Sequence, residues 1–583
     1  MSLAKSNRPV VESLDALANR VASGTRLSIG GHHFARLPIA LLRAIAKSGV
    51  RDLNYFAWAG GLPLELLLEA GVIGSIDICF SSLDIFGLAP RFREIAEKRR
   101  LPVRDWPALT MIQGLRAAQQ NLPFMPVQLP KGSTMMERCP ALTNYHDTRT
   151  GMEIGLVEAQ VIDTLLLHAP RADSDGNVEI YGAKALDLAL TGAARQVLVT
   201  VEEIVPAGTL QQGSRNTILT RNLITAIAEV PGGAYPTSCL PYYATDYARI
   251  RDILEGKHGL LIDALGSDGP SELLRRAAKV QATDVVPQPF RDGSPEPAHP
   301  RVDEIMTVRI ARMLDNESFA SAGAVSPLGN VAYRLAKATH APGLFIGTFS
   351  CGHVDVRAGT MTLSLLEAMD ASSAVSHSGG DEAYSTYYQP GIVTHEIIGA
   401  AQIDALGQTN NLELSKPSGG RLRLPGQGGM SDVANMHRDY VVYVPRHSRM
   451  ALVDSVETVS SARGLIAADE RMRVGYRPGD IFLVTNLCLF RFDETQGQLV
   501  VVETMPGVTR ETIVAETGFK VIFAKDCHEM VAPTALELKV LREQIDPLGI
   551  RRLEFVGAKD RGALLDEILR RDLDGTAHII GEV

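Results

Sequence analysis

The same alternation of apolar strands, glycine turns and helices occurs twice along this chain, and it restricts the fold more than any other feature. In the first half, the apolar stretches 26–31 and 52–61 each end in a Gly-Gly pair, and a helical pattern follows each of them. In the second half, a helical pattern that begins at Pro327 precedes an apolar stretch and turn at 343–352. Alternating strands and helices are typical of folds built on a mainly parallel sheet. We therefore predict an α/β fold with flanking helices.

A proline-rich segment separates the two halves. Residues 287–303 contain five prolines and show no apolar periodicity, which is typical of a linker. The halves also share a motif, Ala-x-x-x-Asp-x-x-Gly-[Asn/Gln], at 169–177 and at 400–408. Any two α/β domains could share such a rhythm, but the common order of these features favours an internal repeat. We predict a first domain at 1–286, a linker at 287–303 and a second domain at 304–583.

Two other stretches suggest local structure. Residues 122–152 are rich in Pro, Met and Gly, and they are expected to form a long loop that could cover a site. Residues 557–583 contain a helical pattern and could dock onto a partner chain.

Composition narrows the range of partners. The 583 residues carry a net charge of −9, and nucleic-acid binding needs clustered Lys and Arg, so we expect no nucleic acid as a main partner. The six cysteines show no CxxC spacing, and no metal-ligand spacing surrounds His32 and His33, so we expect neither a disulfide framework nor a bound metal. We see no apolar signal region and no apolar run of about 18 residues, so we expect no membrane contact and a cytoplasmic location.

The loop at 425–434 is the first stretch that could carry chemistry. Its glycines Gly426, Gly428 and Gly429 allow the backbone to approach a ligand closely and to present successive N–H groups. Such donors suit a phosphate or a developing oxyanion. The alternative is a tight turn with a purely structural role.

Several stretches together resemble the family I coenzyme A transferases. The pattern Gly-x-Gly-Gly-x-x-Asp-x-Ala at 426–434 is similar to a glycine loop of that family, and 399–408 is similar to a stretch of its β subunits. The first half resembles the α subunit, especially of the glutaconate transferase type, at 122–126, 168–177 and 231–238. The resemblance covers roughly 10–250 and 302–460 and keeps the order of the subunits.

The resemblance implies a fusion of α and β subunits, which gives two pseudo-repeated CoA-transferase-type domains with the active site in the cleft between them. It implies an acyl-CoA as substrate, with coenzyme A entering as part of that substrate, and a carboxylate as acceptor. Gly426, Gly428 and Gly429 would then bind CoA or the oxyanion, and the Gly30–Gly31 turn could contact the CoA phosphates. We also expect a homodimer or a homotetramer.

One position departs from the family pattern. In these transferases a β-subunit Glu, in a Phe-Glu-x-Gly turn, attacks the thioester carbonyl and carries the acyl group as an anhydride, which stays reactive enough for onward transfer. The matching turn is Phe349–Gly352, and Ser350 stands where the Glu is expected. A neutral hydroxyl cannot reproduce that double exchange without a base, so the resemblance alone does not fix the reaction.

Three accounts of the reaction remain open. A neighbouring carboxylate could replace the Glu, and the candidates near in sequence are Asp355, Asp381 and Glu382. Alternatively Cys351 or Ser350 could be the nucleophile, with His353 or His377 as its base, although a small Cys at a strand end is more often buried and inert.

The third account is hydrolysis. Some members of this superfamily lack the β-subunit Glu and hydrolyse a cyclic acyl-CoA with an acidic residue of the α-like half. The matching stretch is Val103–Pro107, with Asp105 as the acidic residue and general base. A surface turn residue is the alternative for Asp105, and a relative that binds acyl-CoA without catalysis is the alternative for the whole protein.

Overall fold

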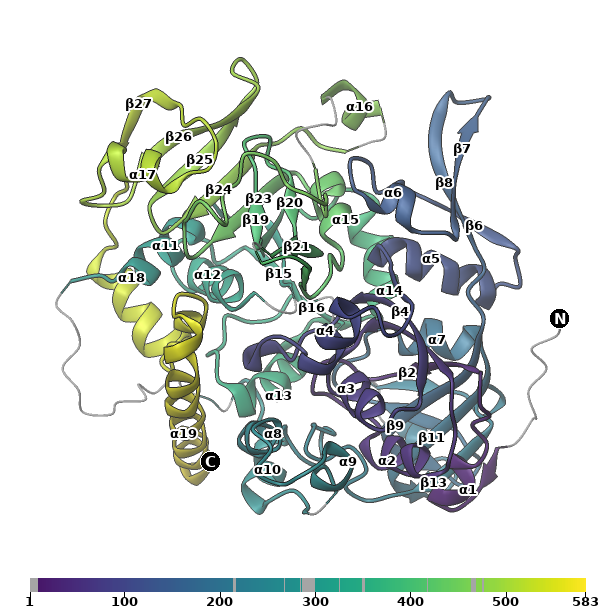
Figure 1. Cartoon of the computed structure of the whole chain (residues 1–583). Helices are drawn as coiled ribbons and strands as arrows, with labels where there is room; N and C mark the ends of the chain where they lie inside the picture. Colours follow the sequence, from purple (N-terminus) through teal and green to yellow (C-terminus); the bar gives the residue numbers. More distant parts are fainter. Residues whose placement is uncertain are drawn as a thin grey trace.

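Two large sheets, one in each half of the chain, form the framework of the protein (Figure 1). The computed structural model describes residues 9–582 apart from 213–215, 267, 284, 286–298, 324–325, 349–351, 417, 463–467 and 474–475. Each sheet has ten strands in the described residues, and helices lie around both of them. The α/β class expected from the sequence is confirmed.

The main path of the first sheet is entirely parallel. Its order is β1 (Val10–Val11), β13 (Ala226–Glu229), β11 (Ala194–Val205), β9 (Ile162–Asp173), β2 (Arg26–Ile29), β3 (Leu53–Ala59), β4 (Ile73–Phe80) and β5 (Val103–Asp105). Two short strands, β10 (Val178–Ile180) and β12 (Thr217–Leu219), add to it antiparallel. The strongly apolar sequence of β9 fits its central place, because a central parallel strand is buried on both faces.

The second sheet has a parallel centre with antiparallel pairing on both sides of it. Its order is β17 (Ser376–His377), β16 (His353–Val354), β15 (Phe345–Thr348), β14 (Phe319–Ser321), β18 (His395–Gly399), β23 (Asp439–Val444), β24 (Ile481–Thr485), β25 (Cys488–Asp493), β26 (Gln498–Thr504) and β27 (Phe523–Glu529). The strands from β15 to β24 pair in parallel, while β16 pairs antiparallel with both β15 and β17 at one edge. On the other side, an antiparallel β24–β25–β26 stretch is followed by the parallel edge strand β27.

The two halves repeat one topology. The parallel order β11-β9-β2-β3 of the first sheet corresponds to β23-β18-β14-β15 of the second. The shared motif also folds alike: the carboxylate of Asp173 accepts from the amide of Asn177 at 2.9 Å, and that of Asp404 accepts from the amide of Gln408 at 3.0 Å. The internal repeat expected from the sequence is therefore confirmed in both topology and turn geometry.

Helices begin where the sequence predicts them. The helical pattern expected after the stretch 26–31 is α2, which follows Pro38, and the helix expected at Pro327 is α12, whose first residue is that proline. The longer helices of the first half are α2 (Ile39–Lys47), α3 (Gly61–Glu69), α4 (Pro90–Glu97), α5 (Ala108–Gln119) and α8 (Tyr247–Leu254), and those of the second half are α11 (Val302–Ala311), α12 (Pro327–Ala338), α13 (Leu363–Ser373) and α19 (Ala558–Glu582).

The expectation of a long loop at 122–152 is wrong. This region forms a small antiparallel sheet of β6 (Phe124–Val127), β8 (Met152–Glu158) and β7 (Leu142–Asp147), with the short helix α6 (Met135–Arg138). The β7–β8 hairpin projects from the body of the molecule (Figure 1). Its side chains along β7 are mostly exposed, so the apolar alternation that marks a half-buried strand is absent from its sequence.

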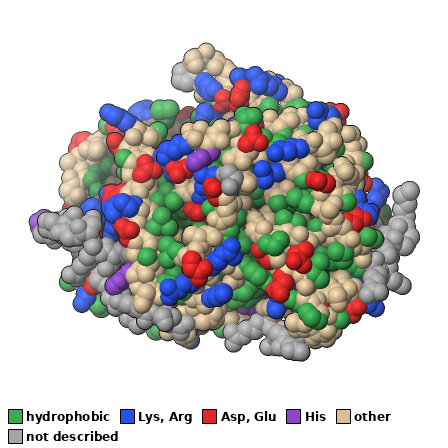
Figure 2. All heavy atoms as spheres, turned by 90° about the horizontal axis from the view of Figure 1, so that it is seen from below, with side chains coloured by type: hydrophobic (Ala, Val, Ile, Leu, Met, Phe, Trp, Pro, Cys, Tyr) green, Lys and Arg blue, Asp and Glu red, His purple; other side chains and the backbone are tan. Residues whose placement is uncertain are grey.

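The C-terminal tail is helical as expected, but it packs within its own chain. Helix α19 lies against α13 and α10 (Glu272–Ala277), and Ile579 and Ile580 near its end are buried there. None of the helices in the described residues combines the length and apolar composition of a membrane span. Acidic and basic side chains are interspersed on the face shown in Figure 2.

A shared apolar cluster joins the halves. Trp106 and Leu109 of the first half lie in one buried cluster with Tyr384, Met430 and Val433 of the second. This buried cluster fixes the position of one sheet relative to the other, so residues of both halves can form one site.

Candidate functional site

A cavity of about 410 Å³ lies between the two halves. The first half contributes His33 and Asp84 to its lining, the second half contributes Thr348 and His353, and the C-terminal part of the chain contributes Leu553. Thr348 is the last residue of β15, so the cavity opens at the carboxyl end of a parallel strand, where α/β proteins commonly bind ligands. The cleft expected between the halves is therefore present at the turn singled out in the sequence.

Ser350 and Cys351, the candidate nucleophiles, lie outside the described residues. Their neighbours are placed: Thr348 and His353 pair across the β15–β16 hairpin, and both line the cavity. The described residues on both sides of these two candidates therefore lie at the cavity wall.

His353 is a buried, neutral imidazole. Its Nδ1 lies 3.2 Å from Nδ1 of His377, and its Nε2 has no hydrogen-bond partner among the described residues. Burial, together with nearby His377 and Lys184, lowers the pKa of His353 to about 3. His353 therefore binds a proton only weakly. It is better suited to accept a hydrogen bond in the cavity than to act as a general acid.

The three carboxylates near the turn in sequence have other partners. Asp355 pairs with the Lys337 ammonium at 2.7 Å, and Asp381 pairs with the Arg116 guanidinium at 3.3 Å. Glu382 is exposed and accepts from the amide of Gly379 at 3.0 Å, which caps the short helix α14 (Gly380–Ala383). None of the three occurs in the described lining of the cavity.

Asp105 also lies away from the cavity. It ends β5 and forms a two-point ion pair with Arg423 of the second half, including an Nη1–Oδ2 contact of 2.9 Å. Both side chains are 8% exposed, and Asp105 borders a separate surface hollow with Glu97 and Arg421. The geometry of Asp105 fits a role in joining the halves better than the role of a free base.

The glycine loop is a seam between the halves. The amide of Gly428 donates to the Cys79 carbonyl of β4 at 3.1 Å, and the amide of Ser81 donates back to the Pro425 carbonyl at 2.8 Å. The amide of Gly426 donates to the Asn411 carbonyl at 3.0 Å. These two glycine amides, predicted to bind CoA or an oxyanion, are thus engaged by backbone carbonyls.

The third glycine of this loop, Gly429, precedes α15 (Met430–Met436) and lies against the Tyr384 hydroxyl. A Cβ at Gly426 would lie 2.5 Å from the Cys79 carbonyl oxygen. The close approach of two backbones explains the glycine at 426 without reference to a ligand.

The Gly30–Gly31 turn has a comparable role. The amide of Gly30 donates to the Leu166 carbonyl at 2.8 Å, and the amide of Gly31 donates to the carboxylate of Asp187 at 2.9 Å. The turn carries His33 into the cavity lining, where its Nδ1 lies 2.6 Å from the Asp84 carboxylate. The His33 side chain that follows the turn is therefore placed to meet a ligand, whereas the two glycine amides are not.

Two carboxyl groups that the sequence reasoning did not single out lie at the cavity. Glu367 of α13 lines it, accepts a hydrogen bond from the Ser238 hydroxyl, and has a pKa raised by burial. Glu396 of β18 is 8% exposed and accepts from the Tyr388 hydroxyl at 2.7 Å. An added Cβ at Gly323, which lines the cavity, would lie 3.3 Å from Glu396 Oε1, so this carboxyl group lies directly behind the wall.

Burial raises the pKa of Glu396 to about 7. A carboxyl group in this range can exchange protons near neutral pH, which general acid–base catalysis requires. In the sequence, Glu396 could have been noticed as a charged residue next to the apolar pair Ile397 and Ile398 of a strand. Glu367, on an ordinary helix, had no comparable signal.

One group of potential metal ligands occurs in the described residues: His168, Glu202 and Cys239. The imidazole Nε2 of His168 lies 2.8 Å from Glu202, and Glu202 also accepts from the amide of Gly232 at 2.7 Å. Burial raises the pKa of the Cys239 thiol well above its usual range, which disfavours the thiolate that metals bind. The donor set fits a buried hydrogen-bonded cluster better than a metal site.

Comparisons with known proteins follow the same division into halves. A family model described as coenzyme A transferase matches residues 11–217 and 304–516. One subunit of the 3-oxoadipate CoA-transferase of Pseudomonas knackmussii is 28% identical over 241 residues, which cover 41% of this chain and 91% of that protein. The two subunits of the glutaconate CoA-transferase of Acidaminococcus fermentans also match. One is 26% identical over 249 residues, which cover 40% of this chain and 78% of that protein, and the other is 25% identical over 251 residues, which cover 42% and 92%.

A relative of a different activity is equally similar. The IpdA subunit of the cholesterol ring-cleaving hydrolase of Mycobacterium tuberculosis is 31% identical over 250 residues, which cover 40% of this chain and 83% of that protein. Among solved structures, an acyl-CoA transferase of Escherichia coli O157:H7, YdiF, in a thioester complex with CoA, has a TM-score of 0.65 at 14% identity. The match covers 90% of this chain and 96% of that one, and it shows that the two proteins share their fold.

Proposed function

This chain belongs to the coenzyme A transferase family, with counterparts of both subunits fused, and from that premise we propose that it transfers CoA between carboxylic acids. The observation that carries the proposal is the cavity between the halves. It is lined by both of them and bounded by the hairpin that holds Ser350. An acyl-CoA bound there would place its thioester beside that turn, with a carboxylic acid as the acceptor.

A carboxylate of the chain has to take the place of the Glu that Ser350 replaces. We assign this role to Glu367 or Glu396, since Glu367 lines the cavity, Glu396 lies directly behind its wall, and neither is paired with a cation in the described contacts. Attack by the carboxylate on the thioester carbonyl would form an acyl anhydride and release the CoA thiolate. Return of the thiolate to the enzyme's carbonyl would give an enzyme–CoA thioester and free the first carboxylic acid.

The test measures acyl-CoA consumption with and without a carboxylate acceptor such as acetate or succinate. Transfer predicts a new acyl-CoA in amounts equal to the acceptor consumed, and little loss of acyl-CoA in water alone. Trapping with hydroxylamine or borohydride during turnover, followed by peptide mass spectrometry, should label one Glu. If no residue is labelled while transfer proceeds, the covalent carboxylate mechanism is wrong.

Hydrolysis of a cyclic or β-keto acyl-CoA is the second candidate, because Ser350 lacks the carboxylate of the transferases and a hydrolase subunit is 31% identical. In that case Glu367 or Glu396 would act as a base toward water or the substrate, and Asp105 would not be required. Turnover in water that is unchanged by any acceptor would favour this function. If the protein binds a CoA ester tightly but turns it over neither with nor without an acceptor, it is a non-catalytic relative.

We also propose that the two domains are residues 1–286 and 304–583, and that the protein assembles as a homodimer or homotetramer. Limited proteolysis should then cut first within 287–303. Light scattering at several concentrations distinguishes these assemblies from a monomer of 62.9 kDa.

A further inference from the structure

The C-terminal part of the chain supplies one wall of the cavity. The match to the family model ends at residue 516, whereas Ile550, Leu553, Glu554 and Arg561 all line the cavity. They belong to the 3-10 helix η6 (Ile550–Glu554) and to the start of α19. We call residues 541–561 the C-terminal wall. This segment lies outside the residues that the family model matches.

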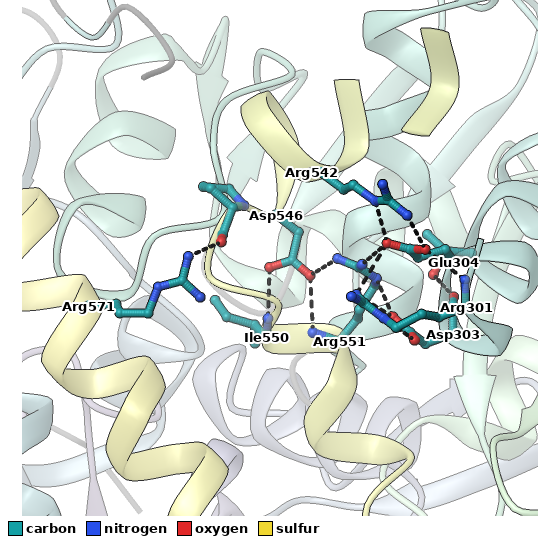
Figure 3. A network of polar contacts seen from close by, with 10 residues as sticks. Arg301, Asp303, Glu304, Arg542, Asp546, Ile550, Arg551 and Arg571 are labelled. Atoms are coloured by element: carbon teal, nitrogen blue, oxygen red, sulfur yellow. Dashed lines mark hydrogen bonds and ion pairs between the residues drawn. The ribbon is translucent and has the colours of Figure 1, made fainter. Parts of the chain in front are cut away.

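A buried ion network fixes one side of this wall to the second half (Figure 3). Arg551, which is 1% exposed, lies between Asp546 of its own segment at 2.7 Å and Asp303 of α11 at 2.9 Å. Arg542 donates twice to Glu304 of α11, at 2.8 and 2.9 Å. A network with this many buried partners holds the wall in one geometry.

The other side of the wall reaches the first half. Arg561 donates to the Ile85 carbonyl at 2.8 Å and to the Leu553 carbonyl. Glu554 accepts from the amide of Leu328 at 2.8 Å and from the Tyr443 hydroxyl. The wall therefore spans the cavity from α12 and β23 to the loop before α4.

The cavity surface beside the wall is apolar. Ile550 and Leu553 share the lining with Met361, Leu363 and Leu366 of the second half and with Ile85 and Leu88 of the first. These side chains come from three separate parts of the chain, so the apolar surface continues around the cavity.

The charged groups of the described lining already have partners. Arg334 binds both oxygens of Asp370, at 2.9 and 2.7 Å, and Arg561 is engaged by two carbonyls. Glu367 adds a carboxyl group of the same charge as a second substrate carboxylate. A substrate ending in a carboxylate would lose its hydration here without gaining a cation in return.

We propose that the two apolar lining residues of the C-terminal wall, Ile550 and Leu553, form the acyl-binding part of the site and select apolar acyl groups over short ones and over those that end in a carboxylate. This inference rests on the proposed function, because it takes the cavity to be the place where the acyl-CoA binds. A volume of about 410 Å³ lies within the usual range for small-ligand sites.

The experiment compares straight-chain acyl-CoA esters of increasing length, and matched esters with a terminal carboxylate, on the full-length protein. Turnover is measured with and without acceptor, and binding is measured separately by calorimetry with unreactive acyl-CoA thioethers. Each added methylene should strengthen binding about fourfold until the cavity is full. A terminal carboxylate should weaken binding at least tenfold against the methyl-ended compound of equal length.

Leu553→Ala enlarges the cavity, and Leu548→Ala is its matched control, since Leu548 is equally buried in the same segment but lies outside the described lining. Leu553→Ala should move the preferred chain length upward by two or three carbons, while Leu548→Ala should leave it unchanged. If Leu553→Ala fails to fold, Ile550→Val provides a milder change with an expected shift of about one carbon.

Each outcome decides between the possibilities. Stronger binding of carboxylate-ended compounds, or the same length preference in the Leu553 and Leu548 variants, overturns the inference. Graded thioether binding without turnover of any ester supports the inference and refutes the proposed function. Turnover with a length preference that Leu553→Ala does not change supports the proposed function and refutes the inference.

Discussion

Replacement of Gly426 by alanine tests whether the glycine loop joins the halves. Gly426 has a φ of +121°, and an added Cβ would lie 2.5 Å from the Cys79 carbonyl oxygen and 2.9 Å from the Phe80 Cα. Both contacts are with backbone of β4, a central strand of the other half, which cannot turn aside as a flexible side chain would. The substitution must therefore separate the loop from β4 and strain the hydrogen bonds beside it.

The size of the effect follows from a matched control. Gly419 lies in a nearby hairpin turn with a φ of +85°, and an added Cβ there meets nothing within 4 Å. A positive φ disfavours alanine at both positions, by about 1–2 kcal/mol where the backbone is left-handed, and the stiffer unfolded chain returns about 0.4–1 kcal/mol in both variants. Only Gly426→Ala adds the cost of overpacking, about 1–3 kcal/mol.

Differential scanning fluorimetry of both variants measures the difference. At roughly 2 °C per kcal/mol, the lower end for large domains, Gly426→Ala should melt about 2–6 °C below Gly419→Ala. CoA-ester affinity of the folded variant should change less than its stability, because the amides of this loop bind protein carbonyls. Equal melting temperatures for the two variants, or a loss of CoA binding without a loss of stability, would refute the structural role of the loop.

Three further predictions address buried charges. Asp105→Asn leaves Arg423 buried without its partner and should cost about 3–5 kcal/mol of stability; a loss of kcat at unchanged melting temperature would instead restore Asp105 as a base. Arg551→Met should cost a similar amount, because Asp546 loses its cation, and urea unfolding would reveal it. For Glu396 the folded protein holds its proton more tightly than the unfolded chain, so stability falls as the pH rises from 4.5 to about 7. Glu396→Gln should therefore be more stable than the native protein at pH 8, by up to about 3 kcal/mol, and about equal to it at pH 4; an equal difference at both pH values would contradict this.

The fold could be predicted from the sequence because the signals were local and repeated. Pro327 marked a helix start, and the apolar stretches that end in Gly-Gly pairs marked the strands β2 and β3. Strand β7 of the β7–β8 hairpin could not be predicted in this way, because its mostly exposed side chains carry no alternation. The strands of the hairpin are held by pairing with each other and with β6, which is information that lies outside any short window of sequence.

The sequence predicted where the cavity lies, but it did not predict which carboxyl groups lie beside it. Thr348 and His353, which flank the expected nucleophile turn, line the cavity. The carboxylates chosen for their nearness in sequence are engaged elsewhere, as Asp355 is by Lys337. Glu367 lines the cavity from the later helix α13, and Glu396 lies directly behind its wall on the later strand β18, which the strand order places beside β14.

The glycine loop shows why a motif can identify a family without identifying a ligand contact. Gly426 is needed because two backbones meet there, a requirement imposed by the joining of the halves whatever reaction takes place between them. Ser350 shows the converse: the residue expected to react has changed while the surrounding hairpin keeps its place at the cavity. On the proposed function, the reaction therefore depends on the buried carboxyl groups Glu367 and Glu396 and on the cavity lining beside them.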